Sequence, residues 1–262
     1  MNKRSLRPVF VKIGGSFITF KDKPFSINYT ALEKLVEIIS KVLDQSIILG
    51  NGGGSFAHPI VKHYREYNTD RLIALCQNST RKLNHIIVNY LVSRGINAVS
   101  MQTSALIYRE NNGYVVNNIP LLLALENNLV PVVYGECILT TTGYEVLSTE
   151  KVFKLLSRSI KPQRIVLLID VEGIYTCSPR ECDNPEIISR IDNSNLNTVL
   201  KLLERDKSRD ATGGVYGKVL EVANISRELR IDIYIVSGFR VEDAVNAIRG
   251  EDIEMGTLIR CY

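Results

Sequence analysis

Short apolar runs alternate with amphipathic helical segments along most of this 262-residue chain. The apolar runs have the length of buried strands, and the segments between them repeat apolar residues at helical spacing. Such alternation is typical of a mainly parallel sheet covered by helices on both faces, in which ligands bind beyond the carboxyl ends of the strands. The predicted strands span 9–13, 46–49, 98–101, 129–134, 164–169, 231–236 and 257–259, and the predicted helices 30–43, 55–64, 70–94, 120–126, 152–156, 215–229 and 241–248.

Two pairs of β-rich runs interrupt this alternation. The runs 106–108 and 114–116 flank an Asn-Asn-Gly turn, which favours a β-hairpin. The runs 138–139 and 144–147 flank a Thr-Gly pair and predict a second hairpin. The polar stretch 177–195 is typical of a surface excursion.

Glycines cluster directly after the first two predicted strands. Lys12 precedes Gly14, Gly15 and Ser16, and the three glycines at 52–54 end the second strand and begin a helix. Backbone N–H groups in glycine loops can approach a phosphate closely, and a helix N-terminus favours that anion. Each loop alone is compatible with a tight turn, but two such loops after separate strands favour a phosphate site.

A third glycine turn precedes the predicted helix at 215–229. Gly213 and Gly214 are followed by Lys218, but the spacing is not that of a Walker A motif, which has Ser or Thr after its lysine. Lys12 and Lys218 at opposite ends of one site would neutralise the charge of a transferring phosphoryl group. Taken alone, the turn slightly favours a glycine-rich helix entry with a solvated lysine.

Two further polar residues lie beside these loops. His58 follows the triple glycine by about one helical turn and could donate a hydrogen bond to a phosphate, although a lone histidine is also common on a surface or in a core. Asp170 ends the most apolar strand, at 164–169. This acid could hold magnesium, a lysine or a ribose, or could merely cap the turn, and the sequence leaves these alternatives open.

Charge and cysteine content restrict the partners and the compartment. The net charge of +4 comes from 32 Lys+Arg and 28 Asp+Glu, a balance that argues against nucleic acid as a partner. Five scattered cysteines argue against a disulfide framework and for a reducing compartment, and they do not complete a zinc motif. No stretch approaches the roughly 18 apolar residues of a membrane span. We therefore expect a cytoplasmic protein that binds no membrane and has no metal site of its own.

In this order the motifs resemble those of the amino acid kinase superfamily over essentially the whole chain, and within it those of the isopentenyl phosphate kinases. The narrower resemblance depends on His58 after the glycine-rich loop and on Lys21 with the Pro-Phe-Ser-Ile run at 24–27. The shared motifs are Lys12-x-Gly-Gly-Ser16, the glycines at 52–54, Asp170-Val-Glu-Gly173, and Asp210-x-Thr-Gly-Gly214 with Lys218.

The resemblance implies a fold and a reaction. It implies an α/β fold, a three-layer αβα sandwich forming one amino acid kinase domain over 1–262, and a homodimer. Residues 1–160 would form the acceptor lobe, with both hairpins, and residues 161–262 the ATP-binding lobe. The implied reaction transfers the γ-phosphate of ATP, with Mg²⁺, to isopentenyl phosphate and gives isopentenyl diphosphate, as in the mevalonate route to isoprenoids.

The resemblance also implies roles for individual residues. The catalytic residues would be Lys12, Lys21, His58, Glu150 and Lys218. The acceptor would be bound by Gly15, Ser16, Gly53, His58 and Thr149. ATP would be bound by Lys12, Gly14, Gly54, Asp170, Tyr175, Gly214 and Lys218.

The chain departs from the family pattern at several of these positions. The family's Gly-Asp pair is replaced by Thr149 and Glu150, which keeps the carboxylate but removes a glycine that would let the acceptor approach closely. These changes leave open a sister kinase for another phosphate, phosphonate or carboxylate acceptor, and a nucleotide-binding regulator without turnover. The other departures are Phe20, Asn51, Ala57 and Glu136.

Overall fold

The computed structural model describes residues 7–20, 22–64, 69–111, 113–177, 179, 182, 184–204 and 214–262. Lys21 and the motif residues Asp210, Thr212 and Gly213 lie outside these residues. The side chains at 58, 61–64 and 69 are likewise not described, so His58 is placed by its backbone alone.

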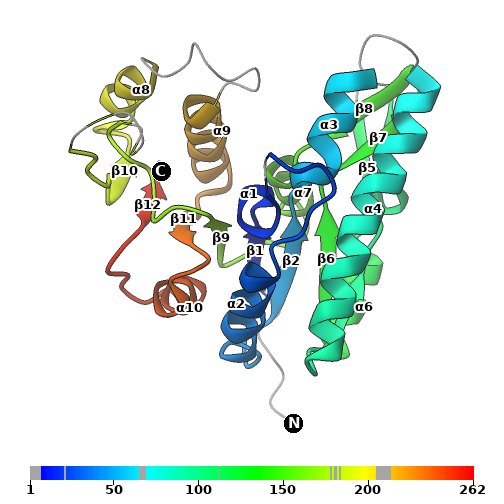
Figure 1. Cartoon of the computed structure of the whole chain (residues 1–262), viewed down its shortest axis with the longest axis horizontal. Helices are drawn as coiled ribbons and strands as arrows, with labels where there is room; N and C mark the ends of the chain where they lie inside the picture. The colour runs from blue at the N-terminus through cyan, green and yellow to red at the C-terminus, as the bar shows by residue number, and fades with distance from the viewer. Residues whose placement is uncertain are drawn as a thin grey trace.

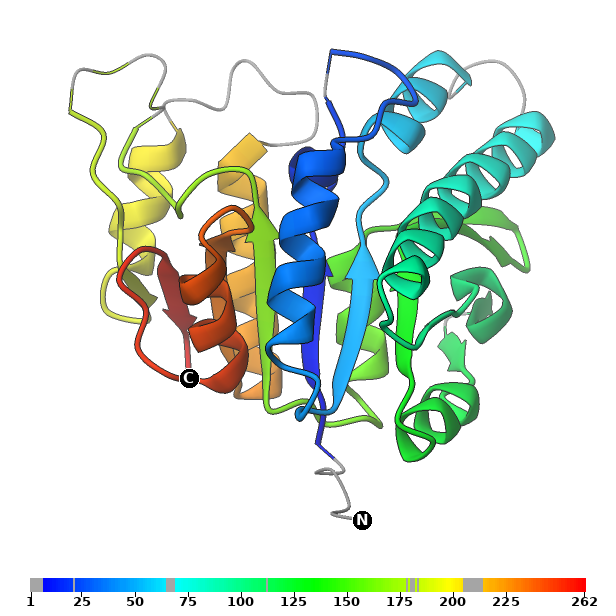
Figure 2. The ribbon, with the colours of Figure 1, turned by 60° about the horizontal axis from the view of Figure 1, so that its bottom comes forward.

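The central sheet confirms the predicted mainly parallel arrangement. Its strands are β1 (Val9–Ile13), β2 (Ile47–Asn51), β3 (Ala98–Ser100), β6 (Val130–Tyr134), β9 (Arg164–Ile169), β10 (Arg190–Asp192), β11 (Asp232–Ser237) and β12 (Thr257–Arg260). Their order is β10-β12-β11-β9-β1-β2-β6-β3 (Figure 1). Neighbours from β11 to β3 are parallel, whereas β12 runs antiparallel to β11 and pairs in parallel with β10. The parallel strands therefore end at one common edge, where the intervening loops gather (Figure 2).

Helices cover both faces of this sheet, as predicted. The longer helices are α2 (Tyr29–Ser40), α3 (Gly54–Tyr64), α4 (Thr69–Ser93), α6 (Ile119–Glu126), α7 (Thr149–Leu156), α8 (Leu196–Glu204), α9 (Gly214–Leu229) and α10 (Val241–Arg249). One apolar core joins the sheet to α2, α4 and α10, and a second joins it to α6, α7, α8 and α9. The molecule is thus a three-layer αβα sandwich. None of the helices in the described ranges is both long and apolar enough to cross a membrane.

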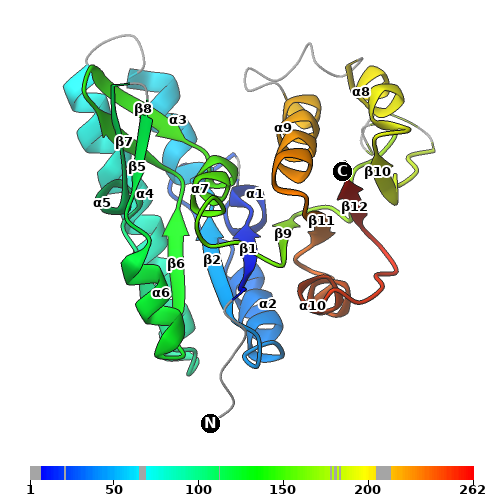
Figure 3. The ribbon, with the colours of Figure 1, turned by 180° about the vertical axis from the view of Figure 1, so that it is seen from behind.

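Both predicted hairpins are present, and they combine into a second sheet. Strands β4 (Ile107–Glu110) and β5 (Gly113–Val116) form the first hairpin, and β7 (Glu136–Thr140) and β8 (Gly143–Leu147) form the other. A parallel contact between β4 and β7 joins them in the order β5-β4-β7-β8, beside α4 (Figure 3).

The polar stretch 177–195 is more than the surface excursion expected from the sequence. It contains β10, which extends the main sheet beyond β12, and the unpredicted helix α8 follows it. Two short helices, α1 (Gly15–Ile18) and α5 (Thr103–Leu106), also lie where only turns or strand ends were expected.

The prediction that the cysteines form no disulfides is wrong for four of the five. Cys76 of α4 is bonded to Cys137 of β7, and Cys177 is bonded to Cys182. The first bond joins residues 61 positions apart, which only the packing of α4 against β7 brings together. Spacing along the sequence therefore could not reveal it.

Side-chain caps fix where two helices near the strand ends begin. The Asn28 side chain accepts a hydrogen bond from the Ala31 N–H and starts α2, and Ser148 accepts one from the Lys151 N–H and starts α7. Such caps satisfy N–H groups that have no partner within the helix. The Ser148 cap therefore fixes the residue at which α7 begins.

The packing of α7 on β1 yields a test of the core. Phe10 of β1 is fully buried, and its ring lies 4.9 Å from that of Phe153. We expect Phe10→Ala to lower the free energy of unfolding by about 3–5 kcal/mol because it leaves a cavity between sheet and helix. Ile119→Ala, at a side chain 62% exposed on α6, should change it by less than about 0.5 kcal/mol. Urea denaturation of both variants measures the difference, and equal losses would contradict this packing.

Candidate active site

The glycine loops after β1 and β2 lie against each other at the carboxyl edge of the sheet. The Gly14 N–H donates to the Leu168 carbonyl (2.8 Å), which ties the first loop to β9. A Cβ atom on Gly15 would lie 2.5 Å from the backbone nitrogen of Gly54. Gly54 itself has a φ of 46°, a conformation that glycine adopts without strain. Glycine is therefore required at both contact points, and the two predicted phosphate loops form one surface.

Thr19 fastens these two loops together. Its hydroxyl donates to the Gly15 carbonyl (2.6 Å) and accepts a hydrogen bond from the Ser55 N–H (2.9 Å), the second residue of α3. The sequence analysis did not single out this residue. A lone threonine after a short helix has no spacing that would distinguish it from any other turn residue.

The segment carrying the Pro-Phe-Ser-Ile run folds over the start of α3. The Phe25 N–H donates to the Ser55 carbonyl (3.2 Å), and the Ser26 N–H donates to the Ser55 hydroxyl oxygen (3.2 Å). The Phe25 ring lies 5.5 Å from the ring of Phe56 in an edge-to-face contact. The backbone of His58 lies one turn into α3. The Pro-Phe-Ser-Ile run and His58 are therefore both placed at the start of the helix that follows the triple glycine.

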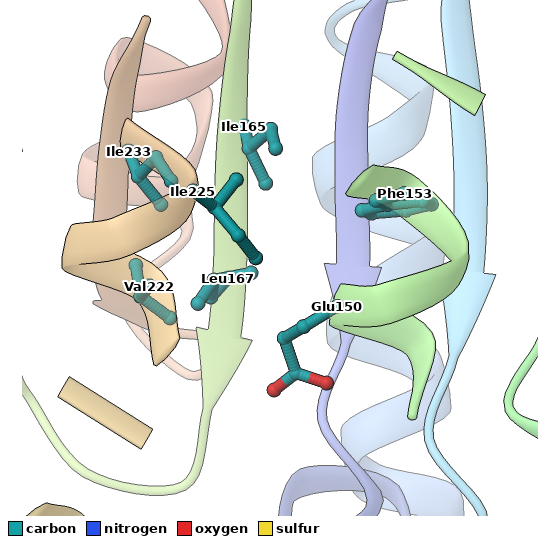
Figure 4. Close-up of a pocket in the computed structure, with 7 residues that line it drawn as sticks. All are labelled: Glu150, Phe153, Ile165, Leu167, Val222, Ile225 and Ile233. Carbon is teal, nitrogen blue, oxygen red and sulfur yellow. The ribbon is translucent and has the colours of Figure 1, made fainter. Parts of the chain in front are cut away.

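A buried ion pair lies directly behind the loops. Lys12 of β1 donates a hydrogen bond to Glu150 in the first turn of α7, and both side chains are nearly buried, with 13% and 8% exposed. Burial alone would raise the pKa of Glu150, but the Lys12 ammonium, with a contribution from Lys218 of α9, holds that pKa below its usual value. Glu150 is therefore ionised at neutral pH, and Lys12 and Lys218, which come from different elements, both act on its charge. Its carboxylate extends from the start of α7 into the space between α7 and α9 (Figure 4).

This arrangement can bind and transfer a phosphate. Glycine loops at strand ends present backbone N–H groups to an anion, and α3 adds the N-terminal end of its dipole. Lys12 and Lys218 can neutralise charge on equatorial phosphoryl oxygens, as phosphoryl transfer requires. Glu150 keeps the Lys12 ammonium at a fixed position.

The Thr149 hydroxyl has a structural role. It donates to the Asn51 carbonyl (2.8 Å) and accepts a hydrogen bond from the Gly135 N–H (3.1 Å), so it joins the ends of β2 and β6 to α7. These bonds help to fix Glu150, the next residue. Acceptor binding by Thr149 itself remains a prediction.

Asn51 is held by a side chain that the sequence analysis missed. Asn84 of α4 donates from its amide to Asn51 Oδ1 (3.0 Å) and to the Val132 carbonyl (3.3 Å), and both asparagines are fully buried. Asn84 accepts in turn from the Ser100 hydroxyl. In the sequence Asn84 stands between Leu83 and His85 within a predicted helix, which gives no signal for this role.

Glu136 keeps a carboxylate in the acceptor half of the chain. It accepts a hydrogen bond from the Ser104 N–H (2.7 Å), and Arg81 lies 3.6 Å from its other oxygen. Burial raises the pKa of Glu136. Its side chain is fully enclosed, so we interpret this departure from the family pattern as part of the packing between β7, α4 and α5.

The residues predicted to lie along the nucleotide surround the ends of β9 and α9. Asp170 follows β9 and is exposed at the same edge as the glycine loops, because β9 pairs with β1. Gly214 begins α9 with a φ of 55°. The Tyr175 hydroxyl donates to Glu172 (2.6 Å), and burial together with this acceptor raises the pKa of Tyr175 to about 12. Contact of these residues with a nucleotide is a prediction.

The chain matches a known protein family. Residues 7–237 match the model described as the amino acid kinase family. An isopentenyl phosphate kinase from Methanothermobacter thermautotrophicus is 31% identical, over 96% of this chain and 98% of its own length. A second, from Methanocaldococcus jannaschii, is 28% identical over 92% of this chain and 95% of its own length.

A solved structure shares the architecture. The protein in "X-ray structures of isopentenyl phosphate kinase" superposes with a TM-score of 0.78 and 27% sequence identity, over 97% of this chain and 100% of that one. The predicted amino acid kinase fold is thus confirmed.

The ion pair gives a testable dependence of stability on pH. We expect Lys12→Met to lower the free energy of unfolding at pH 7 by about 3–5 kcal/mol, because it leaves the Glu150 carboxylate buried without its partner. The depressed pKa of Glu150 contributes stability above the unfolded value, near 4.5, and this contribution is lost as the pH falls through the folded value. Urea denaturation of wild type and variant from pH 8 down to about pH 2 should therefore show a difference that shrinks below about pH 4.5.

The control is Lys34→Met, at a solvent-exposed pair with Glu37 on α2. Its effect should stay below about 1 kcal/mol at every pH. A Lys12→Met effect of that size, or one independent of pH, would contradict a buried, ionised Glu150.

Proposed function

The chain belongs to the amino acid kinase family, and from this premise we propose that it transfers the γ-phosphate of ATP to isopentenyl phosphate, giving isopentenyl diphosphate and ADP. The relatives named isopentenyl phosphate kinase match almost the whole chain and almost their own full lengths, which supports this acceptor over others. The observation that carries the proposal is the Lys12–Glu150 pair, which lies beneath two touching glycine loops within the field of Lys218.

The proposed chemistry needs positioning and charge neutralisation. An oxygen of the acceptor's phosphate is already a nucleophile, so no strong base has to remove a proton. Lys12 and Lys218 would contact the transferring phosphoryl group from opposite sides. Glu150 would hold Lys12 in place, and Lys21, outside the described residues, would add a third positive charge.

The two halves of the chain would divide the substrates between them. We propose that residues 1–160 bind the acceptor, with Gly15, Ser16, Gly53, His58 and Thr149 around its phosphate. Residues 161–262 would bind ATP, with Asp170, Tyr175 and Gly214 along the nucleotide and with Gly14 and Gly54 beside its phosphates. The arrangement supports a shared site because Gly15, Gly53 and Asp170 follow β1, β2 and β9, which are parallel neighbours in the main sheet.

Magnesium would enter with ATP. Within the described ranges, no three His, Cys, Asp or Glu side chains converge on a point that could hold an ion. We propose that Mg²⁺ takes its ligands mainly from ATP phosphates and water, as is usual for this ion. A homodimer, a cytoplasmic location and a place in the mevalonate route remain predictions from sequence.

An acceptor comparison tests the proposal. Purified protein with Mg-ATP should release ADP with isopentenyl phosphate at a kcat/KM about 10²-fold or more above that with fosfomycin or N-acetylglutamate, which lack the isoprenoid phosphate ester. Dimethylallyl phosphate tests how strictly the tail is recognised. Reactions without acceptor give the background of ATP hydrolysis.

Other outcomes lead to different functions. If the protein turns over only an acceptor other than isopentenyl phosphate, it is a kinase but not an isopentenyl phosphate kinase. This is the result expected of a sister kinase in which Thr149 and Glu150 have changed the acceptor. ATP binding without ADP release on any acceptor would indicate a regulatory protein and would contradict the proposal.

A further inference from the structure

A polar contact joins α7 to α9 beside the ion pair. Ser148, the N-cap of α7, donates from its hydroxyl to Glu221 Oε1 of α9 (3.2 Å). The Ser148 hydroxyl oxygen also accepts a hydrogen bond from the Lys151 N–H (3.1 Å). The contact links residues 73 positions apart, one in each proposed lobe. Glu221 is thus connected to the first turn of the helix that carries Glu150.

Glu221 shares a helix face with Lys218. The two are three residues apart on α9, a spacing that places side chains on the same side of a helix. Burial and the nearby Glu150 charge raise the pKa of Glu221, while the Ser148 hydrogen bond and the charges of Lys12 and Lys151 act in the opposite direction. Glu221 therefore faces the same group of charges as Lys218, one turn further along the helix.

A small hollow interrupts the apolar core between α7 and α9 beside Glu150. The hollow lies between Phe153 of α7 and the side chains of Val222 and Ile225 of α9, with Glu150 at its side (Figure 4). Because close-packed side chains normally fix the distance between helices, polar contacts must contribute more here. The described contacts of this kind are Ser148–Glu221 and, two turns along α9, the ion pair between Lys154 and Glu228 (2.6 Å).

We propose that Glu221 is a positioning residue for phosphoryl transfer, whose hydrogen bond to Ser148 holds α9 so that Lys218 faces the Lys12–Glu150 pair. The inference rests on the proposed kinase function and deepens it. Glu221 acts through Lys218 and does not itself contact the reacting atoms. The bond spans the two lobes at the point where their catalytic lysines must meet.

Three variants test this role. Glu221→Ala removes the hydrogen bond, and Glu221→Gln keeps an oxygen that can accept it. Glu228→Ala removes the other α7–α9 contact, further from Lys218. We expect Glu221→Ala to lower kcat by up to about 10²-fold, with KM for the acceptor changed less than about threefold, because a small displacement of a catalytic group costs rate more than binding.

The controls separate positioning from general stability. Glu221→Gln should recover most of the lost kcat. Glu228→Ala, which removes a contact two turns further along α9 from Glu221, should leave kcat within about twofold and change the thermal midpoint little, since exposed ion pairs contribute little to stability. Steady-state kinetics and thermal unfolding of the full chain give all of these values.

Two results would overturn the inference. One is an equal effect of Glu221→Ala and Glu228→Ala on kcat. The other is a Glu221→Gln variant as slow as Glu221→Ala, which would mean that the charge matters and the hydrogen bond does not. A wild-type protein without turnover on any acceptor would instead overturn the proposed function, and the inference with it.

Discussion

The buried ion pair between Lys12 and Glu150 is the interaction on which the rest of the carboxyl edge depends. Two charges removed from water are tolerated only if each meets the other in good geometry. Lys12, the second-last residue of β1, must therefore face the first turn of α7, 138 positions away along the chain. Thr149 and Ser148 secure that placement, since the first joins α7 to the ends of β2 and β6 and the second caps the helix.

The glycine loops after β1 and β2 lie against each other next to this pair. Gly15 and Gly54 approach within a distance that no side chain would permit, and Thr19 fastens the loops. The asparagine at position 51 is accommodated by Asn84, so a departure from the family pattern is absorbed by a buried amide contact. Lys218 completes the group from α9, across a junction that polar contacts span.

Patterns in the sequence predicted the regular strands and helices, and they missed the features that depend on single contacts. The strands β1, β2, β6 and β9 and the helix α4 were predicted because continuous apolar runs and helical periodicity mark buried elements. The edge strand β10 was missed because it is short and half-exposed. The parallel contact between β4 and β7 and the Cys76–Cys137 bond depend on how separate hairpins and helices pack.

The same distinction applies to the site. Its glycine loops and lysines could be predicted because two glycine clusters follow separate strands and a lysine lies close to a glycine turn at Lys12 and at Lys218. The contributions of Thr19, Asn84 and Glu221 were not, because each is one polar side chain that meets a distant segment. No periodicity or motif in the local sequence encodes such a meeting, and only the folded chain reveals it.

The measurement that tests the central claim most directly is kcat for Lys218→Ala with Mg-ATP and isopentenyl phosphate. Lys218 is exposed, so its removal should leave the fold intact. If the charge centre performs phosphoryl transfer, kcat should fall by about 10²–10³-fold, as for the loss of one donor that stabilises transition-state charge, with a much smaller change in KM. An unchanged kcat would contradict the assignment of phosphoryl transfer to Lys12, Glu150 and Lys218.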